Sequence, residues 1–131
     1  MSMLELQKSV FARLSTLSYQ IYDAVPQSTA GDSNAAFPYI VVGDDTFDEW
    51  DTDEDLGYQA TVTIHCWSRY TGKKEVKEMQ DAIYSTLHRY PLVVSGYNVV
   101  DVIFEFAETM LDPDGKTRHG VQRARIILEG V

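Results

Sequence analysis

Apolar residues recur at helical intervals in two stretches of the chain. Near the N-terminus, Ser2 and Glu5 have the S-x-x-E spacing of a capping box. The apolar positions that follow predict a first helix over about residues 3–23: Leu6, Val10, Leu14, Leu17 and Ile21. A second helix is expected between Thr71 as its N-cap and Pro91 at its end. Its apolar side is made by Val76, Met79, Ile83, Leu87 and Tyr90.

Strand patterns occupy most of the remaining sequence. From Ala60 to Trp67, apolar residues alternate with polar or aromatic ones, which predicts a strand with one buried face. The segment 24–38 is rich in small residues and proline and predicts a long loop. D-P-D-G at 112–115 is typical of a type I turn joining two strands. In all, four strands are expected, over about residues 39–42, 60–67, 97–109 and 118–129.

Side-chain parity predicts how the last two strands pair. Val100, Val102, Phe104 and Phe106 fall on one face of the first strand, and Ala124, Ile126 and Leu128 on one face of the second. These two faces should lie on the same side of the sheet. Placing Phe104 opposite Ala124 also places Glu105 opposite Arg123, with Arg125 diagonal to Asp101, so that charges complement each other on the outer face.

Together these elements predict one α+β domain spanning residues 1–131. A mainly antiparallel sheet of about four strands would pack against two amphipathic helices, in the order helix, strand, strand, helix, strand, strand. The length of 131 residues suits a single core. The N-terminus lacks the layout of a signal peptide, and no apolar stretch is long enough to cross a bilayer, so we expect a soluble protein made in the cytoplasm.

Negative charge is concentrated in one segment. The chain carries 20 acidic and 11 basic residues, a formal charge of −9. Eight of the acids lie in D-D-T-F-D-E-W-D-T-D-E-D at 44–55, and the rest of the chain is almost neutral. We interpret 44–57 as a solvated acidic loop whose charges repel one another. Phe47 and Trp50 are either anchors for a contact made on assembly or aromatic residues that pack onto the parent domain.

The acidic segment does not match a calcium site. In an EF-hand loop starting at Asp51, acids would stand at positions 1, 3 and 5, but Leu56 takes the place of the required glycine and Val62 that of the bidentate glutamate. A metal-dependent hydrolase would need carboxylates from separate elements around a cavity, and these are neighbours on one segment. An acidic DNA mimic, or another small binding or inhibitor module, is the alternative that the charge suggests.

Catalytic and cofactor signatures are weak. The single cysteine, Cys66, shares parity with the buried face of its strand, whereas His65 points to the opposite face. Cys66 is therefore expected to be a buried, inert thiol. The histidines show no metal-ligand spacing, and a glycine-rich phosphate loop and a G-x-S-x-G motif are lacking. We expect neither enzymatic activity nor a cofactor or metal.

The order of several short motifs resembles a known family. The chain reads LQKSVFARLS, then YDAVP, FPYIVVGDD, TVTIHCWSRYTGKKEV, AIYSTLH and finally DPDGKTRHGVQRARIILEG. This order is similar to the tail-completion or tail-terminator proteins of long-tailed phages and prophages, including the lambda tail terminator. The resemblance runs from Leu6 to Gly130.

The resemblance implies a structural role in the virion. Subunits would form a homo-hexameric ring that caps the tail tube protein, ends tube polymerisation and offers a surface to the head connector or stopper. DNA would pass through without specific binding, and the protein would move from the host cytoplasm to the neck end of the tail. No membrane is involved.

Two hypotheses concern the acidic residues of such a ring. Carboxylates could line or rim the channel and repel DNA phosphates, or the segment could dock on a positive patch of the tube or connector. The candidate interface or lumen residues are Asp44, Asp45, Phe47, Asp48, Glu49, Trp50, Asp51, Asp53, Glu54, Asp55, His65, Trp67 and Arg69. The last three lie on the face opposite Cys66, where the alternative is a second helix covering that face.

Overall fold

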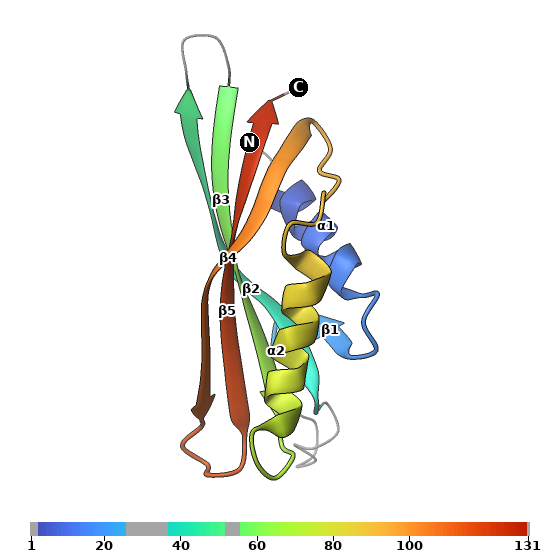
Figure 1. Ribbon diagram of the computed structural model, residues 1–131, viewed down its shortest axis with the longest axis vertical. Coiled ribbons are helices and arrows are strands. Elements are labelled where there is room, and N and C mark those ends of the chain that lie inside the picture. Colours follow the sequence, from blue (N-terminus) through green and yellow to red (C-terminus); the bar gives the residue numbers. More distant parts are fainter. Residues whose placement is uncertain (1–2, 26–36, 52–55, 131) are drawn as a thin grey trace.

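One twisted sheet with two helices on a single face makes up the fold (Figure 1). The computed structural model describes residues 3–25, 37–51 and 56–130. In chain order the elements are α1 (Met3–Leu14), β1 (Gln20–Tyr22), β2 (Tyr39–Asp51), β3 (Leu56–Ser68), α2 (Lys74–Leu87), β4 (Tyr97–Leu111) and β5 (Arg118–Gly130). The five strands lie in the order β1-β2-β3-β5-β4. β1 is parallel to β2 and all other pairs are antiparallel. The α+β class is confirmed, whereas the sheet is mixed and has one strand more than expected.

The core lies between the helices and the sheet. Leu6 and Val10 of α1 and Ile83 of α2 are almost fully buried against alternate residues of the central strands, such as Ile64 and Ile126. The alternation predicted for 60–67 is confirmed, because Ala60, Val62, Ile64 and Cys66 are all buried. Periodic apolar residues therefore placed the helices and the central strands correctly.

The first helix is shorter than predicted. It ends at Leu14, and the hydroxyl groups of Ser15 and Thr16 donate hydrogen bonds back to the carbonyls of Phe11 and Arg13. Such local hydrogen bonds compete with continuation of a helix. The chain then turns, and residues 20–22 form β1 instead of a last helical turn.

The second helix also begins later than predicted. Lys73 is its N-cap and makes no side-chain capping bond, so Thr71 is not the cap. The predicted apolar side is buried at Val76, Met79, Ile83 and Leu87. Tyr90 lies beyond the end of the helix and is exposed.

The acidic segment is largely strand, so the interpretation of 44–57 as a loop is wrong for the described residues. β2 runs on through Asp51, and β3 starts at Leu56. Phe47 pairs with Ala60 and is only 9% exposed, which confirms that this aromatic ring packs onto its own domain. Pairing with β3 satisfies the backbone of β2 and outweighs the repulsion among its carboxylates. Asp53, Glu54 and Asp55 lie outside the described residues.

The predicted pairing of Phe104 with Ala124 is confirmed, but β4 contains two bulges. One bulge lies between Val99 and Asp101 and the other between Phe104 and Phe106. Each extra residue shifts the alternation by one position. As a result Val100 and Phe106 are 54% and 41% exposed, so the prediction that both face the core is wrong.

The bulges also change the predicted charge pairs. Phe106, and not Glu105, lies opposite Arg123. The Glu105 carboxylate nevertheless accepts hydrogen bonds at 2.8 Å from both Arg123 and Arg125. Asp101 instead pairs with Arg89 at 3.5 Å.

Candidate functional site

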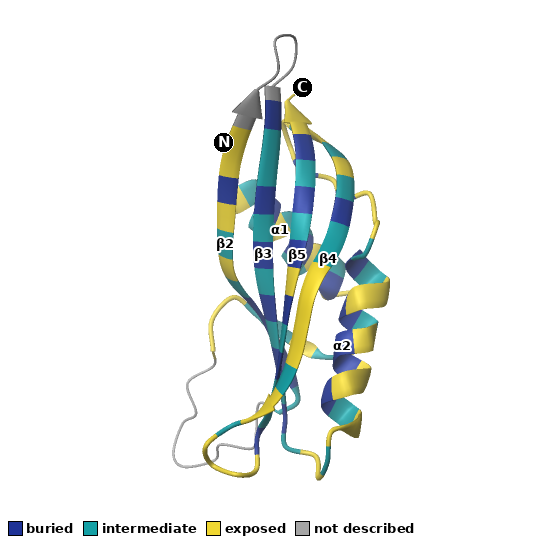
Figure 2. Cartoon of the chain, turned by 60° about the vertical axis from the view of Figure 1, so that its left-hand side comes forward, coloured by how far each residue is buried: buried dark blue, intermediate teal, exposed yellow. Residues whose placement is uncertain are grey.

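The outer face of the sheet, opposite the helices (Figure 2), carries His65 and Trp67 among the residues singled out from the sequence, whereas Phe47 is buried on the core side. Both α1 and α2 pack on the other face, so the alternative in which a helix of this domain covers His65 and Trp67 does not hold for the described elements. Surfaces of this kind are available for contacts between molecules. The outer face is therefore the first place to look for a function.

An aromatic row crosses three strands at one end of this face. Tyr39 of β2, Trp67 of β3 and His119 of β5 are direct cross-strand neighbours. The Trp67 ring stacks on His119 at a centroid distance of 4.4 Å and on Tyr39 at 5.0 Å. Stacked pairs of this geometry stabilise a sheet beyond their buried area. The row holds the three strands in register and gives the outer face a rigid end.

A histidine pair lies beside the aromatic row. His65 Nδ1 and His119 Nε2 are 2.8 Å apart, so one imidazole donates to the other. Burial lowers the pKa of both histidines, and the neighbouring His65 lowers the pKa of His119 further. Gly43 makes room for the pair, because a Cβ there would be 2.8 Å from the His65 ring. The pair is therefore neutral at pH 7 and belongs to the packing of this face.

Arg69 is fixed at the same end of the sheet. Its Nε donates to the Thr117 hydroxyl at 3.1 Å, and its guanidinium lies 3.7 Å from Asp114 and over the ring of Phe37. Asp114 in turn accepts bonds from the backbone and hydroxyl of Thr117. These bonds lower the pKa of the Asp114 carboxyl to about 2. Arg69 thus ties the end of β3 to the turn between β4 and β5.

A positively charged pocket opens beside Arg69. It has a volume of about 480 Å³ and is lined by Arg69, Thr71, Gly115, Lys116 and Arg118. Asp114 neutralises Arg69, whereas among the described residues no carboxylate lies within 4.0 Å of the charged groups of Lys116 and Arg118. We call this region, residues 69–74 with residues 112–118, the cationic end.

Acidic side chains line β2 at the other end of the molecule. Asp44, Asp48 and Glu49 are exposed and Asp45 is partly exposed. Within the described part of the chain, none of these four forms an ion pair. The structure describes the backbone of Trp50 and Asp51 but not their side-chain environment. We call residues 44–51 of β2 the acidic end.

Sequence reasoning missed His119 as a partner of His65 and Trp67. Its parity with Val121 and Arg123 places it on the outer face, which was readable from the sequence. The pairing of β3 with β5, which brings it against Trp67, was not readable. Arg123 and Arg125 were identified as outer-face charges, and both are found there, bound to Glu105.

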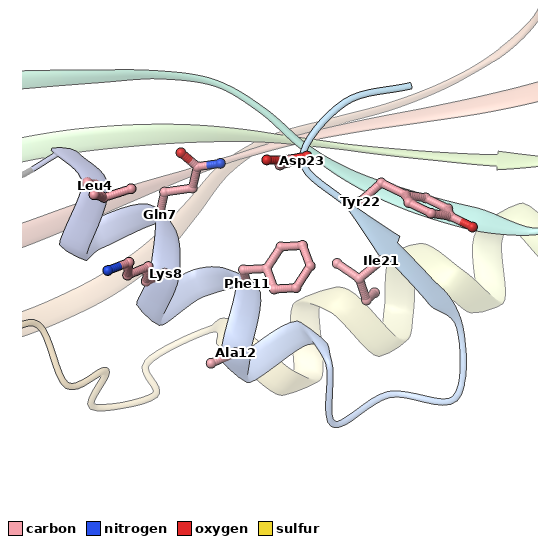
Figure 3. Close-up of a pocket in the computed structure, with 8 residues that line it drawn as sticks. All are labelled: Leu4, Gln7, Lys8, Phe11, Ala12, Ile21, Tyr22 and Asp23. Atoms are coloured by element: carbon pink, nitrogen blue, oxygen red, sulfur yellow. The ribbon is translucent and has the colours of Figure 1, made fainter. Parts of the chain in front are cut away.

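An apolar groove separates α1 from the edge strand β1. Its volume is about 410 Å³. Figure 3 shows the Phe11 ring directed toward Ile21, with Gln7 and Lys8 along the helix and Asp23 at the far rim. The groove makes the β1 side of the molecule a second surface with apolar character.

The described residues offer little for catalysis. They contain no group of three or more histidine, cysteine or acidic side chains placed to hold a metal ion. Cys66 is fully buried, and burial raises the pKa of its thiol to about 12, as expected for an inert side chain. None of the described helices has the length and apolar character needed to span a bilayer.

Comparison with known proteins identifies relatives across nearly the whole chain. Residues 8–129 match the family model described as Tail completion protein gp17. The Tail completion protein gp17 of Bacillus phage SPP1 is 28% identical over 125 residues, covering 94% of this chain and 91% of that protein. A chain in the virion of a native gene transfer agent particle has the same fold, with a TM-score of 0.80, 20% identity and 95% of each chain covered.

Proposed function

Since the chain belongs to the Tail completion protein gp17 family of phage tail proteins, we propose that six copies form a ring on the end of the tail tube. The ring ends polymerisation of the tube protein and presents a surface to the head connector or stopper. DNA passes through the ring without specific binding. This role is an assembly function and requires no chemical reaction.

One observation supports the proposal more than any other: the sheet is covered on one side only. Its outer face, the edge strand β1 and part of the other edge strand, β4, are left for contacts with other molecules. A ring needs two different contact surfaces on each subunit, because its contacts are head-to-tail. A domain with two distinct edges and one uncovered face supplies such surfaces.

The β4 edge is partly closed by the chain itself. The backbone N–H of Arg89 donates to the carbonyl of Val102, and the Gln80 amide donates to the carbonyl of Glu108. Beyond these bonds, Met110 and Leu111 are 36% and 54% exposed. Exposed apolar residues on an edge strand favour a partner. We therefore assign the last part of β4 to a contact between subunits or with the tube.

Several residues proposed from the sequence keep a part in this function. Asp44, Asp45, Asp48 and Glu49 are placed on an exposed strand where they can meet another molecule. His65, Trp67 and Arg69 shape the surface, since they are half-buried and hold strands in place. Phe47 contributes to the core and not to a contact.

Tail length in assembled particles tests the proposal. Particles are produced in cells that lack the gene, and tails are measured by negative-stain microscopy with and without a plasmid copy. We expect tails of irregular, extended length that fail to join heads, and restoration by the plasmid. Purified protein added to polymerising tube subunits should also stop growth and leave a sixfold cap on the tube end. Tails of normal length joined to heads in the absence of the gene would refute the function.

A further inference from the structure

The two ends of the elongated sheet carry opposite charge. Figure 1 shows the end of β2 at one pole of the molecule, and the turn between β4 and β5 with the start of α2 at the other. The acidic end holds five acids and no base: Asp44, Asp45, Asp48, Glu49 and Asp51. The cationic end holds five bases, Arg69, Lys73, Lys74, Lys116 and Arg118, against two acids, Asp112 and Asp114. Two of these bases are paired, Arg69 with Asp114 at 3.7 Å and Lys74 with Glu78 at 4.0 Å.

The two ends cannot neutralise each other within one molecule. Glu49 pairs with Tyr58, and Ser68, the cross-strand partner of Arg118, lies ten residues further along β3. At about 3.3 Å per residue this separation is roughly 33 Å. The Debye length at physiological ionic strength is about 8 Å, so attraction over that distance is screened. The separated charges therefore do little for the stability of a single subunit.

Repulsion within each end persists in the single subunit. The cross-strand neighbours of Asp48 and Glu49 are Gln59 and Tyr58, and neither carries a compensating charge. At the other end, Lys116 is exposed, and Arg118 donates to the backbone carbonyl of Lys116 instead of to a carboxylate. Contact with a surface of opposite charge would relieve both sets of repulsions.

We propose that the acidic end of one copy docks into the cationic end of the next copy. Asp48 on the outer face of β2 and Glu49 on its other face flank the strand end that approaches the pocket lined by Lys116 and Arg118, with Arg69 bound to Asp114 in the pocket wall. The contact joins two different surfaces, so it is head-to-tail and closes into a ring if the rotation per subunit allows. This contact rests on the proposed ring assembly and identifies the two surfaces through which neighbouring subunits bind.

A second copy fits this pocket better than nucleic acid does. Nucleic-acid binding needs lysines and arginines along a run of phosphates, whereas the pocket is small and its Arg69 is already paired with Asp114. A strand end that carries a few carboxylates matches a pocket with a small excess of positive charge. The chain itself supplies such a strand end in β2.

Reciprocal charge reversal tests the contact. One variant carries Asp48→Lys and Glu49→Lys, and the other Lys116→Glu and Arg118→Glu. At the exchanged positions, each variant alone sets like charges facing each other, whereas in an equimolar mixture opposite charges face each other again. A control for the second variant with the same change in net charge, Lys8→Glu with Lys77→Glu, alters exposed lysines on the helices.

Association is measured by analytical ultracentrifugation at 20 and 500 mM salt, and by carbodiimide crosslinking of carboxylates to lysines followed by mass spectrometry. We expect each reversed variant to associate roughly tenfold or more weakly than the wild type and the control. The mixture should recover association that is lost at high salt. The wild type should yield crosslinks between copies that join Lys116 to Asp48 or Glu49.

Three results would overturn the contact: equal association of wild type and reversed variants, no association in the mixture, or crosslinks that join other surfaces. A mobility-shift assay tests the alternative ligand. If the wild type binds DNA and only the variant Lys116→Glu with Arg118→Glu loses that binding, the pocket belongs to nucleic acid instead. Tail length distinguishes failure of the proposed contact from failure of the proposed capping function. A reversed variant that still yields tails of normal length would leave the capping role intact and remove only the contact.

Discussion

Gly120 of β5 packs closely against Gln80 of α2, and adding one methyl group there should destabilise the protein. A Cβ at this site would lie 2.7 Å from Cys66 Sγ and 2.8 Å from the side-chain amide of Gln80. Both neighbours are held by their surroundings. Cys66 is fully buried, and the Gln80 amide donates to the Glu108 carbonyl and accepts from the Thr109 hydroxyl.

The expected cost of Gly120→Ala follows from these contacts. Overpacking of a close-packed interior costs about 1–3 kcal/mol. Displacing Gln80 also weakens its two side-chain hydrogen bonds, each worth about 0.5–1.5 kcal/mol. We expect the free energy of unfolding to fall by about 2–4 kcal/mol, which in a domain of this size lowers Tm by roughly 10 °C.

Urea denaturation followed by tryptophan fluorescence measures this loss. A matched experiment repeats Gly120→Ala in a Cys66→Ala background, where the sulfur contact is gone. The alanine should then cost less by about 0.5 kcal/mol or more, because the two sites are in contact. A Gly120→Ala protein with the wild-type denaturation midpoint would show that α2 and β5 are not packed as described.

Three further predictions concern titratable groups. Burial lowers the pKa of His65 and His119, so the unfolded chain binds protons more readily than the folded protein. The free energy of unfolding should therefore fall as the pH drops below about 6.5. Urea midpoints that rise between pH 7 and 5.5 would contradict this. The Asp114 carboxyl has a pKa of about 2 in the fold, so Asp114→Asn should lower Tm at pH 7, and the difference should disappear as the pH falls through about 2. The thiol of Cys66, with a pKa of about 12, should react with Ellman's reagent only after unfolding, and fast reaction in the native protein would contradict its burial.

The sequence predicted those elements whose residues face one core with a regular period. Met79 and Ile83 mark the buried side of α2, and Val62 and Ile64 that of β3, because burial on a helix or strand requires a fixed spacing. The pairing of Phe104 with Ala124 also followed from the sequence, since the D-P-D-G turn fixes which strands are neighbours. Local chemistry and periodicity are enough to predict an element and its neighbour where the contacting residues are near in sequence.

Elements that depend on distant partners could not be predicted in the same way. β1 reads as the end of a helical pattern, and it becomes a strand because Ile21 pairs with Ile40 of β2. Asp48 and Glu49 read as loop residues, and they lie on a strand because β3 supplies the hydrogen bonds of their backbone. Such a choice depends on free energy gained across the sheet, which local propensity does not record.

For the candidate surfaces, too, some features followed from the sequence and others only from the tertiary structure. The sequence alone determined the concentration of acids at 44–55, the outward parity of His65 and Trp67, and the family to which the motifs point. Only the tertiary structure decided that His119 stacks on Trp67, that Lys116 and Arg118 open a pocket beside Arg69, and that this pocket lies at the pole opposite the acids. The physical reason is that charge and periodicity are written into the chain residue by residue, whereas distances between residues far apart in sequence are set by how the strands pair.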